Sequence, residues 1–404
     1  MVKLKLHWQI LIAMVIGSVA GSFFGEQLLW LAFLGDLFLR LLKMIIVPLI
    51  LSSIISGVTS IGSAGKLGKI SLKTFAYYIS TSFIAIITGL ILVNLVQPGV
   101  GANLGFEEAP TGLTTIKSPI DILYRIIPTN PIASMANGEI LPIIFFSLLF
   151  GYFITRLPEK QRQQMTGFFE SIFQIMMKMT GVIIRLAPIG VFGLMLKIVA
   201  KTGFSAFGPL LTYMSVVAGG LLIHAFITLP LILHFIARVN PFNFFRNMAS
   251  ALSTAFSTSS SSATLPLTMR SVEKKAGVSN KISSFVLPLG ATINMDGTAL
   301  YECVAAVFIA QAYGIELSFF QQMIVVVTAL LASIGAAGVP MAGLVMMSII
   351  LNAVGLPLEG VGLIIAVDRI LDMMRTTVNV WSDSVGTMTI AMSEGEVTNI
   401  DPAE

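Results

Sequence analysis

The chain has 404 residues, 55% of them hydrophobic and only 11% charged, with a formal net charge of +4. A soluble domain carries roughly 25% charged residues, and apolar runs longer than the roughly 20 residues that cross a bilayer recur along this chain, so an ordinary soluble protein is excluded and an all-α polytopic membrane protein is predicted. Because no basic patch with interleaved aromatic residues appears, we expect membrane lipid and no nucleic acid as a partner.

Apolar spans fill the first part of the chain. They are expected at residues 8–24, 37–61, 74–96, 120–154, 168–199 and 209–237. The first span has a basic start but no small-residue cleavage site, so we interpret it as a retained helix and not as a signal peptide. Lys3 and Lys5 place the N-terminus in the cytoplasm by the positive-inside bias. Prolines at 128, 131 and 142 interrupt the fourth span.

The segment NMASALSTAFSTSSSSATLPLTMR, residues 247–270, breaks the alternation of sides. Basic residues precede and follow it, so both of its ends should be cytoplasmic. Its centre, residues 257–262, is a hydroxyl-rich run that would be costly against lipid. A hairpin that enters from the inside and turns back at the serines meets both conditions. A flexible serine-rich linker is the alternative.

A second interrupted segment follows the next expected span, at residues 283–313. No lysine or arginine occurs between Ile282 and Asp368, and acidic residues flank the stretch VVVTALLASIGAAGVPMAGLVMMSIILNAV, which suggests that both of its ends are external. Helix-breaking Gly and Pro residues lie at its centre. We therefore expect a second hairpin that enters from outside. A final helix then returns the acidic C-terminal tail to the cytoplasm.

Hairpin and span thus occur twice, in opposite orientation. Inverted repeats with broken helices near the bilayer midplane are typical of secondary transporters, although ion channels also use re-entrant loops. An intramembrane protease is the enzyme alternative, but the GxGD and GxSxG patterns are missing and the histidines form no dyad, so we expect no enzyme. His7, His224 and His234 have no metal-ligand spacing and are expected to pack or to lie at interfaces.

The last helix carries a polar stripe on an otherwise apolar surface. At 100° per residue the stripe falls within an arc of about 80°, and its members are Asp368, Asp372, Arg375, Asn379 and Asp383. Charges are expensive inside a membrane, so the stripe should face a partner or a wet cavity. Internal ion pairs that only hold helices together are the bland alternative.

The same stripe suits a zwitterion that carries an extra carboxylate. The Arg375 guanidinium offers a bidentate fork for a carboxylate, Asp372 can receive an ammonium group, and amide and carboxylate oxygens suit a small cation. We therefore expect an acidic amino acid, aspartate or glutamate. A C4-dicarboxylate lacks the ammonium group and a neutral amino acid would leave Arg375 unpaired, but both remain alternatives within this architecture.

The preceding span supplies the facing residues in PLGATINMDGTALYECVAA. Asn294, Thr298 and Glu302 follow one another at helical spacing, and Gly290 and Gly297 would let the helix unwind. Burial favours the protonated form of a carboxyl group, so Glu302 is the candidate proton carrier. A permanently protonated or hydrogen-bonded structural role is the alternative.

These segments resemble the dicarboxylate/amino acid:cation symporter family, which includes the excitatory amino acid transporters and their archaeal glutamate-transporter homologues. The matching motifs are YYISTS, STSSSSATLP, NMDGTALYE, AAGVP and DMMRTTVNV..D, in the family's order. The resemblance implies eight transmembrane helices plus two re-entrant hairpins, a homotrimer in the plasma (inner) membrane, and an elevator mechanism coupled to sodium, to protons, or to both. It implies scaffold helices in residues 1–73 and 119–207, and a mobile transport domain in residues 74–118 and 208–404.

The resemblance also implies site residues. Those for substrate are Ser261, Thr298, Val339, Gly343, Asp372, Arg375, Thr376 and Asn379. Those for a first sodium site are Gly290, Asn294, Asn379 and Asp383. Those for a second are Thr292, Ser333, Ile334 and Ala336, and those for a third are Tyr78, Thr81, Ser82, Asn294 and Asp296.

The chain departs from the family's usual pattern in three ways. Ser382 and Met341 stand where glycines are usual, so we expect differences in the first sodium site and in closure of the second hairpin. The family places an extra arginine near the substrate at positions that are Ser259 and Met373 here. Arg369, one turn before Met373, is the candidate substitute.

Overall fold

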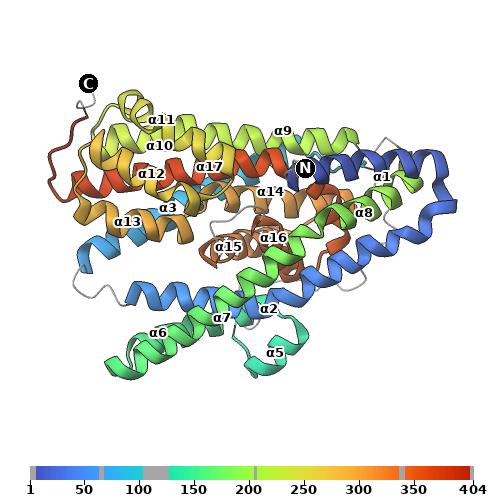
Figure 1. The fold of residues 1–404 in the computed structure, drawn as a ribbon, viewed down its shortest axis with the longest axis horizontal. Helices are drawn as coiled ribbons and strands as arrows, with labels where there is room; N and C mark the ends of the chain where they lie inside the picture. Colours follow the sequence, from blue (N-terminus) through green and yellow to red (C-terminus); the bar gives the residue numbers. More distant parts are fainter. Residues whose placement is uncertain (1–5, 63–67, 103–126, 204–206, 336–341, 401–404) are drawn as a thin grey trace, which may run out of the picture.

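The computed structural model describes residues 6–62, 68–102, 127–203, 207–335 and 342–400, and every regular element in these segments is a helix (Figure 1). The helices divide into two groups by their packing. The first group consists of α1 (Leu6–Leu28), α2 (Phe33–Gly62), α5 (Pro131–Asn137), α6 (Ile140–Thr155), α7 (Glu159–Arg185) and α8 (Ala187–Thr202). Within it, α1 packs along α8, and α2 packs against α6, α7 and α8.

The second group holds the polar segments. Its members are α3 (Gly68–Val96), α9 (Phe207–Ile223), α10 (Leu229–Ile232), α11 (Pro241–Thr258), α12 (Ser261–Lys274), α13 (Asn280–Ile293), α14 (Asp296–Ala312), α15 (Phe319–Gly335), α16 (Ala342–Val354) and α17 (Val361–Ser393). The helix α17 contacts α9, α11, α12, α13 and α14. The two groups meet where α15 and α16 lie against α2, and where α17 approaches α1 and α8.

Both interrupted segments contain two helices that pack against each other. In the first, α11 and α12 lie side by side, and the chain turns between them at Ser259, whose φ of 50° is left-handed (Figure 1). The break between α13 and α14 lies at Asn294, whose backbone is extended, and at Met295, whose backbone is also non-helical, and not at the nearby glycines. In the second segment, α15 packs against α16, and the AAGVP tip lies outside the described residues.

Six of the described helical segments are long and apolar enough to cross a membrane. They are Trp8–Gly25, Leu29–Thr59, Lys69–Val96, Glu159–Arg185, Phe207–Ala237 and Asn280–Ala312. The helix α17 has 33 residues, as many as the longest of these segments, but its ionisable stripe lowers its hydropathy. The expected span at 120–154 is described only from residue 127, where it forms α5 and α6.

The expectation of one continuous span at residues 168–199 is wrong. The chain forms two helices there, α7 and α8, which meet at Leu186. Pro188 occupies the first turn of α8. Because proline lacks an N–H and is tolerated best in a first helical turn, it marks a helix start here and not a position within a continuous helix.

Candidate functional site

The polar stripe of α17 is buried, and its centre is Arg375. The guanidinium donates from Nη1 to Asp368 Oδ1 at 2.9 Å and from Nη2 to Asp372 Oδ1 at 2.8 Å. The internal ion pairs considered from the sequence are therefore present. They join residues of one helix, so they do not themselves tie α17 to a neighbour. They hold the guanidinium in place and keep two buried carboxylates compensated.

Arg375 is enclosed by two other helices. Its guanidinium carbon lies 3.8 Å from the ring centroid of Tyr301 on α14, within the range of a cation–π contact. On α16, a Cβ added to Gly343 would lie 3.2 Å from Nη1 and 3.3 Å from Nη2. The backbone of Gly343 therefore packs close to the guanidinium, where a side chain would crowd it. Arg375 is buried, and its Nε has no hydrogen-bond partner among the described residues. The planar fork of a guanidinium is suited to a carboxylate.

Asn379 joins α17 to the start of α14. Its Oδ1 accepts from the backbone N–H of Gly297 at 2.8 Å, and its Nδ2 donates to Thr298 Oγ1 at 3.1 Å. The first N–H groups of a helix have no partner within that helix, and the residue before α14 supplies no side-chain cap. Asn379 on α17 therefore caps the first turn of α14, and its bond to Thr298 holds that hydroxyl against α17.

Of the two hairpin tips that are expected to contact the substrate, only the first lies within the described residues. Ser261 is buried at the first position of α12, and Thr376 is buried on α17 next to Arg375. Val339 lies outside the described residues, so its expected contact with substrate stays a prediction.

Asp383 and Asn294 bring the first expected sodium site together. Asn294 donates from Nδ2 to Asp383 Oδ1 at 2.9 Å and to Ser382 Oγ at 3.0 Å. A Cβ at Gly290 would lie 2.4 Å from Asp383 Oδ1, so only glycine permits this approach. Ser382, which stands where the family usually has glycine, also donates to Asp296 Oδ2 at 2.6 Å and so connects the first expected site with the third.

Asp296 is the centre of the third expected site. Ser82 donates to its Oδ1 at 2.6 Å and Thr81 at 3.3 Å, while Thr81 Oγ1 also lies 3.5 Å from Asn294 Oδ1. Tyr78 lies beside Gly290 of the first expected site, because its hydroxyl is 2.8 Å from the position of a Cβ on Gly290, and it donates to the Val286 carbonyl at 2.7 Å.

Neither Asp296 nor Asp383 forms an ion pair with a lysine or arginine within the described segments. Both are buried. Two buried carboxylates surrounded by hydroxyl and amide oxygens form a donor set that fits a hard cation, whose charge would compensate theirs.

The sequence reasoning did not anticipate a contact between His224 and an expected site residue. His224 was expected to pack or to lie at an interface, but its Nε2 lies 3.0 Å from Asp296 Oδ2, and both side chains are fully buried. It begins a π-helical turn, η3 (His224–Thr228), which changes the helical register. The available signal was an ionisable residue at membrane depth, which is a functional candidate by default.

The residues expected at the second sodium site are described in part. Ser333 is buried and Thr292 is exposed, and each hydroxyl donates to a carbonyl of its own helix. Their helices, α15 and α13, are in contact. The side chain of Ile334 and the whole of Ala336 lie outside the described residues.

Glu302 lies one turn beyond Thr298 on α14. Its relative exposure is 0%, and neither carboxylate oxygen has a hydrogen-bond partner among the described residues. Arg369, the candidate substitute for the extra arginine, has Nη1 3.6 Å from Asp372 Oδ2. Arg369 and Arg375 therefore approach different oxygens of the same carboxylate, Asp372.

The chain was compared with known proteins. The model of the sodium:dicarboxylate symporter family matches residues 6–393. A proton/glutamate-aspartate symporter of Escherichia coli K12 is 38% identical over 97% of this chain and 94% of its own length. Human excitatory amino acid transporter 3 is 39% identical over 98% of this chain and 88% of its own length. A proton/sodium-glutamate symport protein of Bacillus caldotenax is 37% identical over 98% and 96%.

A family match over nearly the whole chain, together with relatives of this identity and coverage, agrees with the motifs in α3, α12, α14 and α17. The chain belongs to the sodium:dicarboxylate symporter family.

Proposed function

We propose that the protein is a secondary active symporter that takes up an acidic amino acid, aspartate or glutamate, together with sodium, protons, or both. The observation that carries this proposal is Arg375, a buried guanidinium that pairs with two carboxylates and whose Nε has no hydrogen-bond partner among the described residues. The relatives named above as glutamate and aspartate symporters support the same substrate class.

In this proposal the side-chain carboxylate of the substrate binds Arg375, and its ammonium group binds Asp372. Thr298, Thr376 and Asn379 supply hydroxyl and amide groups around the substrate. Ser261 and Val339 would contact the substrate from the two hairpin tips, and Gly343 would place no side chain against the guanidinium.

Aspartate and glutamate should outcompete succinate and serine for uptake of radiolabelled aspartate into proteoliposomes. Succinate lacks the ammonium group that Asp372 would bind, and serine lacks the side-chain carboxylate that Arg375 would bind. The competition constants of the four compounds give the order directly. If serine or succinate displaced aspartate better than both acidic amino acids, the substrate assignment would be wrong.

We propose that Asp296 and Asp383 compensate the charge of sodium ions, which are cargo. Up to three sites are proposed: one at Gly290, Asn294, Asn379 and Asp383, one at Tyr78, Thr81, Ser82, Asn294 and Asp296, and one at Thr292, Ser333, Ile334 and Ala336. Support for the first two comes from the buried carboxylates of Asp383 and Asp296, which form no ion pair with a lysine or arginine among the described residues.

Asp383→Ala should raise the sodium concentration needed for half-maximal uptake before it changes the order of substrate preference. Asp383 contacts Asn294 and not the groups around Arg375. Uptake of aspartate measured against a sodium series checks this. A channel is the rival function, and it would show a sodium conductance of channel size that neither saturates nor responds to aspartate.

Gly290→Ala should raise the sodium concentration needed for half-maximal uptake. The higher helix propensity of alanine should not offset this effect. The added Cβ would meet Asp383 Oδ1 at 2.4 Å and the Tyr78 hydroxyl at 2.8 Å, so the carboxylate must move. Alanine gains about 1 kcal/mol of helix propensity over glycine. Gly219→Ala on α9 has the same gain with nothing within 4 Å of the new Cβ, and it is the matched control.

The sodium concentration for half-maximal uptake should rise in Gly290→Ala and stay at the wild-type value in Gly219→Ala. Equal values in both variants would show that the close approach at Gly290 does not shape a sodium site.

We further propose that the group of α1, α2 and α5–α8 is a trimeric scaffold and that the group around α17 is a transport domain that moves as an elevator. The packing within each group, and the limited contact between them at α15, α16 and α17, support this division. The protein would lie in the plasma (inner) membrane as eight transmembrane helices and two hairpins, with both termini cytoplasmic. Cross-linking of the purified protein in membranes to trimers, and not to dimers, is the expected result.

A further inference from the structure

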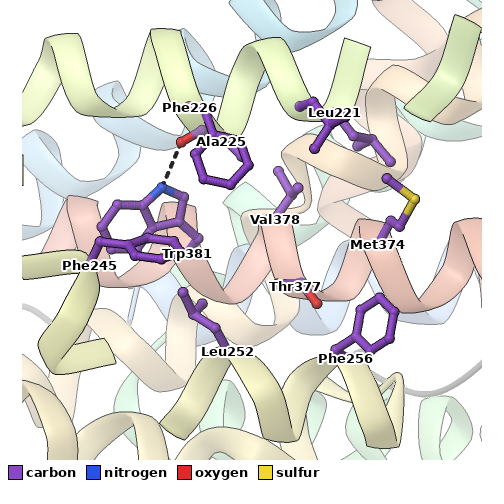
Figure 2. Close-up of a pocket in the computed structure, with 11 residues that line it drawn as sticks. Leu221, Ala225, Phe226, Phe245, Leu252, Phe256, Met374, Thr377, Val378 and Trp381 are labelled. Carbon is purple, nitrogen blue, oxygen red and sulfur yellow. Dashed lines mark hydrogen bonds between the residues drawn. The ribbon is translucent and has the colours of Figure 1, made fainter. Parts of the chain in front are cut away.

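An apolar cavity lies behind the site helix α17, away from the polar stripe. It has a volume of about 220 Å³ and is formed between α9, the π-helical turn η3, α11 and α17 (Figure 2). Its lining presents no polar surface. Figure 2 shows Trp381 and Phe245 together at one end, and Met374 and Phe256 at the other.

Trp381 is held in the cavity wall by a hydrogen bond to a backbone carbonyl that the π-helical turn leaves without a backbone donor. In this register the N–H of Leu229 donates to the His224 carbonyl, five residues earlier. The next donor would be residue 230, which is Pro230 and has no N–H. The Ala225 carbonyl therefore lacks that partner, and Trp381 Nε1 donates to it at 3.0 Å (Figure 2). The indole is held in place, with its ring in the cavity wall.

The cavity opens to the outside of the helix bundle. Leu222, Phe226 and Phe256, which lie around it, are 48%, 59% and 42% exposed. The helix α9 packs against α3, α14 and α17, and α11 packs against α12 and α17. These helices occupy the edge of the molecule opposite α2 and α7 (Figure 1). In a membrane this edge contacts lipid hydrocarbon.

Basic side chains occur at the end of the cavity where Phe245 lies. Arg246 follows Phe245 directly, and Arg238 ends the preceding helix, where its φ of 56° is left-handed. Both are exposed, and neither forms an ion pair with a carboxylate in the described ranges. The positive-inside bias places this end at the cytoplasmic surface, whose lipids carry negative charge.

We propose that the cavity binds an acyl chain of an anionic phospholipid from the cytoplasmic leaflet, with its headgroup at Arg238 and Arg246. An apolar cavity is not filled by ordered water and takes an apolar guest. The opening toward hydrocarbon supplies the chain, and the two arginines supply the charge complementarity. This lipid site is separate from the proposed substrate and sodium sites.

The bound chain would support α17 from behind. Met374, Thr377, Val378 and Trp381 line the cavity, and at 100° per residue their mean direction is about 150° from that of the polar stripe. The same turns of α17 therefore present Arg375 and Asn379 to the site and an apolar wall to the lipid.

Fluorescence quenching of Trp381 tests the proposal directly. The chain has three tryptophans, so Trp8→Phe with Trp30→Phe leaves Trp381 alone. In vesicles that contain phosphatidylglycerol with brominated acyl chains, we expect strong quenching of Trp381, because the bromine atoms enter the cavity whose wall it forms. Ala225→Leu and Leu252→Phe each fill the cavity and should reduce the quenching several-fold.

Ala249→Leu is the control, because Ala249 is exposed on α11 and does not line the cavity. It should leave the quenching unchanged. Equal quenching in the filled and unfilled proteins would overturn the proposal, since bromine would then reach Trp381 without entering the cavity, and so would the absence of quenching in the unfilled protein. Stronger quenching by brominated phosphatidylglycerol than by brominated phosphatidylcholine, reduced by Arg246→Gln, is expected for the headgroup. Equal quenching by the two lipids would overturn that part.

Discussion

Arg375→Cys should reduce uptake of aspartate and glutamate by about 100-fold or more. Hydrogen bonds to charged groups contribute about 1.5–3 kcal/mol each, a bidentate pair has two of them, and each 1.4 kcal/mol is a factor of ten. The loss should appear in the concentration for half-maximal binding of acidic substrates. Binding and uptake in the same proteoliposomes measure it.

A second consequence of Arg375→Cys is structural, and it must be separated from the first. Among the described residues, removal of the guanidinium leaves Asp368 as an uncompensated buried carboxylate and Asp372 with Arg369 as its ion-pair partner. Removing one partner of a buried pair costs about 3–5 kcal/mol. Asp368→Asn combined with Arg375→Cys removes one of these charges, so its thermal stability should recover toward that of the parent. Uptake of acidic amino acids should not recover with it.

Serine uptake gives the converse measurement. Without the guanidinium, the ammonium-binding Asp372 remains, and the site no longer contains the group that selects a side-chain carboxylate. We expect the double variant to gain serine uptake, while Arg375→Lys, which keeps the charge but not the fork, retains weak acidic-substrate uptake. Wild-type aspartate affinity in the double variant would contradict the role assigned to Arg375.

The sequence predicted those features of the site that depend on local patterns. The serine run predicted a hairpin, and the chain turns at Ser259 between two packed helices. Helical spacing on α17 predicted one polar stripe, and all five of its members make side-chain hydrogen bonds with one another or with residues of the NMDGT segment. The internal ion pairs that were weighed as the alternative also occur, since Arg375 donates to Asp372 and to Asp368, which lies two turns away.

The features that the sequence did not predict arise where the helical register changes or where distant segments meet. A uniform 100° per residue fails at the π-helical turn that begins at His224, so its contact with Asp296 could not be read from periodicity. The contact between Ser382 and Asp296 joins residues on two helices, and only tertiary packing sets it. The span expected at residues 168–199 was wrong because overall hydropathy concealed a helix start at Pro188.

The environment of Glu302 bears on the identity of the coupling ion. Burying an ionised carboxylate without a hydrogen-bond donor costs free energy, whereas the protonated acid is neutral and costs less. Both oxygens of Glu302 are in this position among the described residues. A proton that binds when the site faces outside and leaves when it faces inside would therefore be carried with the substrate.

Glu302→Gln should remove the coupling to protons and keep substrate binding. In proteoliposomes of the parent protein, a more acidic exterior should accelerate aspartate uptake, and uptake should acidify the interior. Glutamine mimics the neutral acid without releasing a proton, so both effects should disappear while aspartate affinity stays within a few-fold. Glu316→Gln, an exposed glutamate beyond the end of α14, is the matched control and should keep both effects.

A structural role for Glu302 predicts a different outcome. A permanently protonated side chain would let the glutamine variant keep the parent's pH dependence and its internal acidification, and the proton route would then lie elsewhere. Full uptake by the parent protein with sodium alone, at equal internal and external pH, would make sodium sufficient. If internal acidification during uptake is lost only in Glu302→Gln, the proton moves with the substrate through this side chain, because no other substitution in the comparison touches a buried carboxyl group.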